Sequence, residues 1–272
     1  NRDLISDFQK AGFAYTANAT QLKALPSTTT KLLGLYAFSN MNVAADKIDG
    51  RRGNPAVVNE FGFPDQPMLD EMTDSALQVL AKNPNGFVLM VEGASIDKQA
   101  HAMDTERWLL ETLEFDRAVK VAQDFARAQG DTLVIVTADH ECSGAALIGG
   151  SRVGDADLQA LAKAGGTENL RDKVVGTYEQ AGFPRYEIAD DGYPATTNID
   201  RRMLIGYGAN ADRYEDWRTN PRPLRDGGHP FVKQDPLASY PASPMARDAD
   251  GRFLVTGQIR GSSAAHTGSD VP

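Results

Sequence analysis

The chain has 272 residues, of which 41% are hydrophobic and 24% are charged, and its formal net charge is −9. This composition is typical of a globular protein with a sizeable core, and it excludes a disordered chain. The acidic balance lacks the basic surface that binds phosphate backbones, so nucleic acid is not expected as a primary partner. The longest apolar runs are too short to span a bilayer, and a single cysteine cannot form an intrachain disulfide.

The first third of the chain indicates short elements joined by loops. Apolar residues on one helical face predict a helix over residues 1–10, and short apolar runs predict strands over 13–15 and 32–38. The stretch 39–66 is rich in Asn, Gly, Pro and charge, which is typical of a surface loop. Apolar residues at helical spacing predict a further helix over 68–81.

A strand–helix–strand pattern follows. Residues 87–91 (FVLMV) and 133–136 (LVIV) are continuous apolar runs, as expected of strands buried on both faces. The long helical segment 105–129 lies between them, and such a crossover joins parallel strands. The sequence therefore predicts an α/β fold with an open, mostly parallel sheet and helices on both faces.

The amino-acid composition changes after residue 149. Residues 150–262 are dense in Gly, Pro, Asp, Asn and Tyr and predict a long irregular insertion or cap, with helix-like pieces over 155–164 and 170–181. We expect residues 1–149 to belong to the α/β domain and residues 263–272 to return to it.

Polar side chains follow both predicted strands, where ligands bind in open α/β sheets. Asp97 and His101 are four residues apart and share a face if they enter a helix, while Asp139 and His140 are adjacent. Oxygen and nitrogen donors without a thiolate suit catalytic zinc, and Glu92 suits magnesium. Each feature has a simpler alternative: a hydrogen-bonded loop pair, a helix N-terminal carboxylate beside a surface histidine, or a glutamate paired with an arginine.

Three stretches together resemble the alkaline phosphatase family. They are FVLMVEGASIDKQAHAMD at 87–104, LVIVTADH at 133–140 and HTGSDVP at 266–272. The resemblance covers residues 1–149 and resumes around His266. The chain begins at Asn1 without an initiator methionine and ends at Pro272, and we expect it to be the C-terminal portion of a longer or processed protein.

The resemblance implies two zinc ions and one magnesium ion. His266 is identified by the resemblance alone. The implied ligands are Asp97, His101 and His266 for the first zinc, Asp139 and His140 for the second, and Glu92 for magnesium, with Lys98 contacting phosphate through water.

The implied activity is hydrolysis of phosphate monoesters at alkaline pH through a phosphoserine intermediate. The family's nucleophilic serine is expected upstream of this sequence, and Ser143, Ser262 and Ser263 are interpreted as loop or helix-end hydroxyls. The resemblance also implies small phosphomonoester substrates, a homodimer, and a periplasmic or secreted location. The alternatives are a related two-metal phosphodiesterase, sulfatase or phosphomutase, or an inactive metal-binding fragment.

Overall fold

The computed structural model of the chain describes residues 2–53, 64–151, 175–176, 186–195, 203–209, 211, 213–214, 241–247, 253–255, 258–259 and 263–268. These residues belong to two compact units. The first unit is Asn1–Ile96 with Leu109–Thr137, and the second is Asp97–Trp108 with Ala138–Pro272. In the part of the chain that the structure describes, no helix is both long and apolar enough to cross a bilayer.

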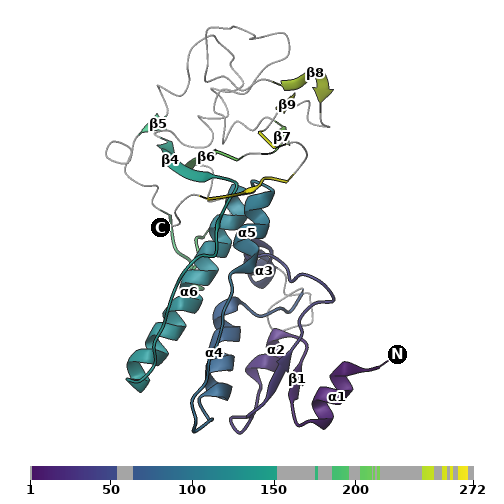
Figure 1. The fold of residues 1–272 in the computed structure, drawn as a ribbon, viewed down its shortest axis with the longest axis vertical. Helices are drawn as coiled ribbons and strands as arrows, with labels where there is room; N and C mark the ends of the chain where they lie inside the picture. The colour runs from purple at the N-terminus through teal and green to yellow at the C-terminus, as the bar shows by residue number, and fades with distance from the viewer. Residues whose placement is uncertain are drawn as a thin grey trace. The chain divides into compact units, whose positions relative to one another are not determined.

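The first unit begins with two short helices and two short strands (Figure 1). Each helix begins at a polar side chain that satisfies an otherwise free backbone N–H: Asp3 accepts from Ser6 at 3.1 Å, and Asn18 accepts from Gln21 at 2.8 Å. The strands form a parallel pair. The predicted helix over 1–10 is confirmed, and both predicted strands are present in part. The elements are α1 (Leu4–Lys10), β1 (Ala14–Thr16), α2 (Ala19–Lys23) and β2 (Leu32–Gly34).

Helix α3 (Ala44–Gly53) shows that the prediction of a surface loop over 39–66 is wrong for residues 44–53, while residues 54–63 lie outside the described part of the chain. Contacts from residues distant in sequence hold this helix. The Glu111 carboxylate accepts the Ala44 N–H at 2.5 Å, at the helix N-terminus, where free N–H groups need partners. The Lys47 ammonium lies 2.5 Å from Glu114, and both side chains are buried. Tertiary contacts, which composition does not reveal, therefore stabilise α3.

The two helices with the clearest apolar periodicity are confirmed. Helix α4 (Leu69–Leu80) matches the prediction over 68–81, and helix α6 (Thr105–Gln129) has the predicted bounds. The Met68 N–H donates to the Glu71 carboxylate at 2.8 Å at the start of α4. Glu114 on α6 accepts the Leu69 N–H at 2.7 Å, which ties the two helices together within the first unit.

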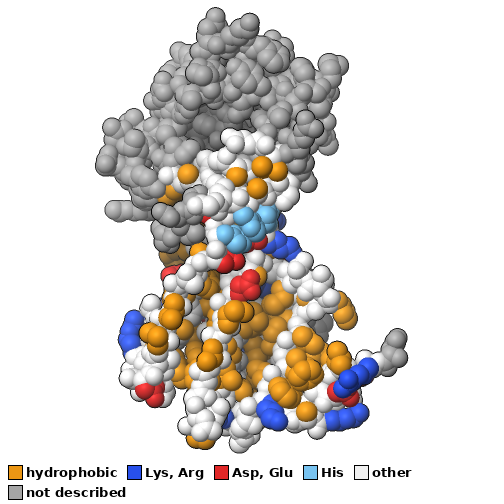
Figure 2. All heavy atoms as spheres, viewed as in Figure 1, with side chains coloured by type: hydrophobic (Ala, Val, Ile, Leu, Met, Phe, Trp, Pro, Cys, Tyr) orange, Lys and Arg blue, Asp and Glu red, His pale blue; other side chains and the backbone are white. Residues whose placement is uncertain are grey.

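The apolar runs 87–91 and 133–136 are not strands buried on both faces, and that prediction is wrong. Neither run pairs with a strand among the described residues, and the exposed fractions reach 96% at Val88 and 82% at Leu133. Together with α4 and α6 they line an apolar groove of about 600 Å³ in the first unit. Figure 2 shows these hydrophobic side chains as an orange surface. Parallel strands bury both faces only with strands beside them and helices over them.

The second unit consists of the end of α5 (Ala94–His101), the start of α6 and short strands. The predicted helix over 170–181 is wrong at Val175 and Gly176, which form a strand, and the one over 155–164 lies outside the described residues. The boundaries at 149 and 262 stay a prediction. The strands are β3 (Glu141–Cys142) paired with β10 (His266–Thr267), β4 (Ala145–Ser151) between β5 (Val175–Gly176) and β6 (Met203–Tyr207), and β9 (Phe253–Val255) between β7 (Arg213–Tyr214) and β8 (Pro241–Arg247).

The predicted α/β class is confirmed, since the chain contains both helices and strands. Among the described strand pairs, β1–β2 is parallel, and those of the second unit are antiparallel.

Candidate metal centre

Helix α5 brings Asp97 and His101 together. The two residues are one turn apart, so their side chains lie on one face of the helix. The Asp97 Oδ1 atom lies 3.4 Å from His101 Nε2. As the four-residue spacing predicts, the two donor atoms share a helix face and are close enough to reach one cation.

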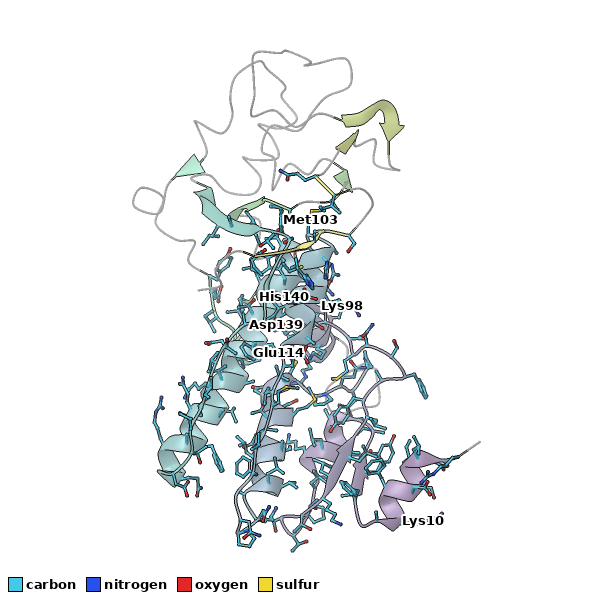
Figure 3. The ribbon with its side chains drawn as sticks, in the orientation of Figure 1. Lys10, Lys98, Met103, Glu114, Asp139 and His140 are labelled. Carbon is cyan, nitrogen blue, oxygen red and sulfur yellow. The ribbon has the colours of Figure 1, made fainter. Side chains whose placement is uncertain are left out.

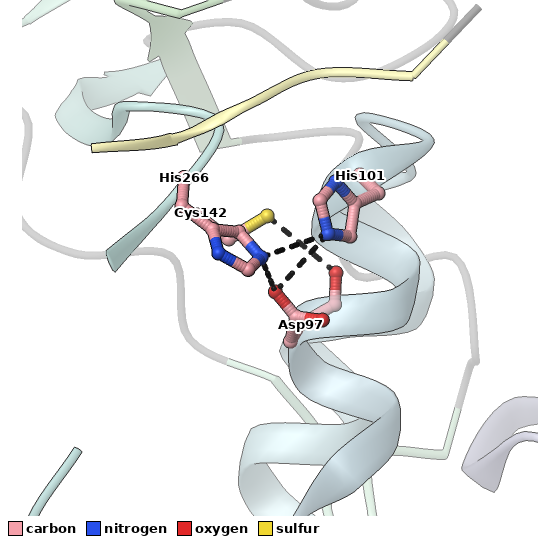
Figure 4. A group of neighbouring side chains, drawn as sticks. All are labelled: Asp97, His101, Cys142 and His266. Carbon is pink, nitrogen blue, oxygen red and sulfur yellow. Dashed lines mark hydrogen bonds and ion pairs between the residues drawn. The ribbon is translucent and has the colours of Figure 1, made fainter. Parts of the chain in front are cut away.

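His266 joins this pair from a distant part of the chain (Figure 4). It lies on β10, which pairs with β3 so that His266 is opposite Cys142. The His266 Nε2 atom lies 3.1 Å from Asp97 Oδ1 and 3.0 Å from His101 Nε2. Three donor atoms from two elements, about 165 residues apart in sequence, therefore form one small triangle.

The hydrogen bonds around the triangle favour a cation. The His101 Nδ1 atom donates to the Ala264 carbonyl oxygen at 2.6 Å, which leaves a lone pair on Nε2 when the ring is neutral. That Nε2 faces the Nε2 of His266. The Asp97 Oδ1 atom is enclosed and accepts no hydrogen bond from the residues described. A buried carboxylate oxygen without a donor is costly, and a bound cation would satisfy it.

The dimensions of the triangle fit zinc. With metal–nitrogen and metal–oxygen bonds of about 2.0–2.2 Å at tetrahedral angles, neighbouring donor atoms are about 3.3–3.6 Å apart. The observed separations of 3.0, 3.1 and 3.4 Å are close to this range. Two imidazoles and one carboxylate with an open fourth position form the donor set of catalytic zinc sites.

Cys142 also lies beside these three residues, a position that no sequence motif indicates. Its Sγ and the other three donor atoms all lie within 4.8 Å of one another. Burial, together with the hydrogen bond and negative charge of Asp97, raises the pKa of Cys142 to about 12. The neutral thiol donates to the Asp97 carbonyl oxygen at 3.6 Å. Its position opposite His266 in the strand pair could have been found only from the pairing register.

Asp139 and His140 form a neighbouring pair in the same unit (Figure 3). The Asp139 carboxylate lies 3.2 Å from His140 Nε2 and is 85% exposed. The His140 ring stacks on the His266 ring, with centroids 3.6 Å apart. The histidines form a single pale-blue patch in Figure 2. The stack places the His140 imidazole directly beside the triangle, on its His266 side.

Glu92 and Lys98 have exposed side chains. Lys98 follows Asp97 on α5, in the second unit, and is labelled in Figure 3. Glu92 belongs to the first unit. Ser143, in contrast, is fully buried, and its hydroxyl donates to the Cys142 carbonyl oxygen at 2.5 Å.

The C-terminal end of α5 is held by contacts within the second unit. The Ala264 N–H donates to the His101 carbonyl oxygen at 2.8 Å, so the segment before His266 is tied to the helix. Met103, just beyond the helix, adopts a left-handed conformation with φ of 54°. The Tyr207 hydroxyl donates to the Met103 carbonyl oxygen at 3.3 Å and accepts from Trp108 Nε1 at 3.0 Å. These contacts offset the cost of that turn and orient His101.

The chain is similar in sequence to known alkaline phosphatases. A family model described as alkaline phosphatase matches residues 1–206. Alkaline phosphatase H of Pseudomonas aeruginosa is 42% identical over 148 residues, which are 51% of this chain and 31% of that protein. The alkaline phosphatase of Escherichia coli is 41% identical over 141 residues, 48% of this chain and 30% of that protein. These alignments thus span about a third of the relatives' length.

Solved structures give the same family name with lower similarity. The alkaline phosphatase of Thermus thermophilus aligns with a TM-score of 0.47 and 29% identity, covering 55% of this chain and 29% of that one. A cold-active alkaline phosphatase of Shewanella aligns with a TM-score of 0.45 and 27% identity, covering 69% of this chain and 44% of that one. His266 lies beyond the residues matched by the family model, so its place in the triangle is an independent observation.

Proposed function

Because the chain belongs to the alkaline phosphatase family, we propose that it forms the zinc-binding part of a metal-dependent phosphomonoesterase. The observation that carries the proposal is the triangle of Asp97 Oδ1, His101 Nε2 and His266 Nε2. Its donor types and its dimensions are those of a catalytic zinc site with one position left for substrate or water.

The remaining ligands are proposed from the family motifs. Asp139 and His140 would hold a second zinc ion, and the stacking of His140 on His266 supports a place for it beside the first. Glu92 would hold magnesium, and the exposed Lys98 would contact the phosphate through water. When bound, zinc supplies a Lewis acid that polarises a phosphoryl oxygen and lowers the pKa of a coordinated hydroxyl.

The chain's own residues would present oriented donor atoms and a negative charge to the zinc ion. His101 is held by its Nδ1–H donation to Ala264, so that its Nε2 lone pair keeps one direction. The Asp97 carboxylate brings the negative charge that a divalent ion requires. Cys142 lies beside the triangle, and the fourth position is proposed for substrate or water. The serine that forms the phosphoserine intermediate is proposed to lie in a segment outside these 272 residues.

The substrates proposed are small phosphate monoesters. A homodimer and export to the periplasm or beyond the cell are proposed on the same family grounds. A phosphodiesterase, sulfatase or phosphomutase built on a similar pair of metal ions, or an inactive metal-binding fragment, is the alternative that experiment must exclude.

A substrate panel tests the proposal. The 272-residue chain and the longest polypeptide that its gene encodes are loaded with zinc and magnesium. Both are assayed at alkaline pH with p-nitrophenyl phosphate, bis(p-nitrophenyl) phosphate and p-nitrophenyl sulfate. We expect the longer polypeptide to prefer the monoester and to lose most activity in Asp97→Ala, while the 272-residue chain shows no turnover.

Three results would contradict the proposal. A preference for the diester or the sulfate ester would favour the alternative enzymes. Unchanged activity in Asp97→Ala would remove the zinc centre from the reaction. Turnover by the 272-residue chain alone would place the nucleophile within it, and Ser263, whose hydroxyl lies 3.4 Å from His101 Nδ1, would be the first residue to replace.

A further inference from the structure

The Glu141 carboxylate joins two segments that carry residues of the metal centre. Its Oε2 accepts the Gly144 N–H at 2.8 Å, and its Oε1 accepts the Ala145 N–H at 2.8 Å. The Thr267 hydroxyl donates to the same Oε2 at 2.5 Å. One side chain therefore connects the turn that follows Cys142 to the residue next to His266.

The strand pair that presents His266 is too short to fix it alone. Strands β3 and β10 have two residues each, and they pair Cys142 with His266 and Glu141 with Thr267. A pair of this length contributes few ladder hydrogen bonds and has no independent stability. The Glu141–Thr267 bond lies one residue from the imidazole, on the directly opposed pair of the ladder. The orientation of β10 therefore depends on side-chain contacts of this kind.

The turn that Glu141 binds is conformationally demanding. Ser143 and Gly144 both have positive φ angles, 65° and 64°. A left-handed conformation is strained for a residue with a Cβ, so it is costly at Ser143 and not at Gly144. At Gly144 a Cβ would also lie 2.7 Å from the Ala209 nitrogen. The two N–H donations to Glu141 offset this cost and hold the turn, and the Ser143 N–H in turn donates to the Ala265 carbonyl oxygen at 2.8 Å.

We propose that Glu141 is a positioning residue of the zinc centre, which fixes the orientation of His266 by joining the 143–145 turn to Thr267. The inference rests on the proposed zinc centre. An ion held by three protein donors depends strongly on the orientation of each, and removal of a residue that orients a ligand lowers metal affinity about 10–100-fold. Glu141 acts through His266 and does not touch the ion.

A thermodynamic cycle tests this role. Zinc affinity of the full chain is measured by competition with a chromophoric chelator for wild type, Glu141→Gln, His266→Ala and the double variant. We expect Glu141→Gln to weaken zinc binding about 10–100-fold in the wild-type background and to have no further effect once His266 is absent. A general loss of structure would instead weaken binding equally in both backgrounds, which would overturn the proposal.

Two further variants complete the experiment. Thr267→Val removes one donor to Glu141 and keeps the side-chain shape, so a smaller loss that also depends on His266 is expected even if Glu141→Gln does not fold. Glu71→Gln is the matched control. Like Glu141, Glu71 accepts hydrogen bonds from a backbone N–H, that of Met68, and from a side chain, that of Arg51, but it lies in the first unit. Its zinc affinity should equal that of wild type.

The outcomes separate the two proposals. If wild type binds no zinc, or if His266→Ala binds it as tightly as wild type, the zinc centre itself is refuted and the role of Glu141 with it. If His266→Ala weakens binding while Glu141→Gln and Thr267→Val do not, the zinc centre stands and the positioning role is refuted.

Discussion

Replacing Glu111 with glutamine should stabilise the protein at alkaline pH and leave its stability nearly unchanged below pH 4.5. The pKa of Glu111 is raised from 4.5 to about 7, chiefly by burial and also by the adjacent Glu114 carboxylate, against the hydrogen bond from the Ala44 N–H and the charge of Lys47. The positive charge of Lys47 is shared between two carboxylates, those of Glu111 and Glu114. Glutamine keeps an oxygen for the Ala44 N–H and offers an N–H₂ group to Glu114, so it resembles the protonated acid.

The sign and size of the change in unfolding free energy follow from the difference between the folded and unfolded pKa values of Glu111. The unfolded chain ionises Glu111 near pH 4.5 and the folded chain near pH 7, so the glutamate lowers stability as pH rises between these values. Below pH 4.5 both states hold the proton and the residue contributes nothing. The advantage of Glu111→Gln should therefore be about 1 kcal/mol at pH 5 and about 3 kcal/mol at pH 8.

Urea unfolding followed by circular dichroism at pH 5 and pH 8 measures this difference. Asp131→Asn, a change of equal charge at an exposed residue, serves as the control and should alter stability by about 0.5 kcal/mol or less at either pH. An advantage of Glu111→Gln that is the same at both pH values would refute the buried-carboxylate account.

Three other predictions follow from the packing and the hydrogen bonds. Lys47→Met should destabilise the protein by about 3–5 kcal/mol in urea unfolding because it leaves Glu114 buried and unpaired, and Lys47→Met with Glu114→Gln should recover most of the loss; equal losses in both would contradict this. Cys142 should react with a disulfide reagent only after unfolding, since the thiol is buried with a pKa raised to about 12, so rapid reaction of the native protein would be inconsistent with its position. Asp3→Ala should cost α1 about 1 kcal/mol, seen as faster amide exchange confined to residues 4–10, because the Ser6 N–H loses its acceptor; unchanged exchange would show that the cap contributes nothing.

The periodicity of apolar residues correctly predicted the helices that bury one apolar face. Helices α4 and α6 bury one apolar face, and their 3.6-residue periodicity is visible in the sequence. Helix α3 has no such pattern, because its contacts come from Glu111 and Glu114, more than sixty residues away. The run 87–91 has the composition of a buried strand, but burial requires neighbouring strands, and composition does not reveal whether they are present.

The residues of the site also fall into those that local spacing predicts and those that depend on distant pairing. Asp97 and His101 could be paired from their spacing, because the geometry of one helix turn sets it. His266 could not be reached by spacing, since a two-residue strand pair brings it to α5, and only the family motif indicated it. Cys142 and Glu141 were missed because their roles come from the register of that pair and from the turn after it.

X-ray absorption spectroscopy of the full chain with one equivalent of zinc tests the zinc centre most directly. The triangle of Asp97, His101 and His266 predicts a shell of nitrogen and oxygen at about 2.0–2.1 Å with the outer scattering of two imidazoles, and no sulfur near about 2.3 Å. His266→Ala should lose one imidazole. A sulfur shell would make Cys142 a ligand, and a spectrum unchanged in His266→Ala would show that zinc binds elsewhere.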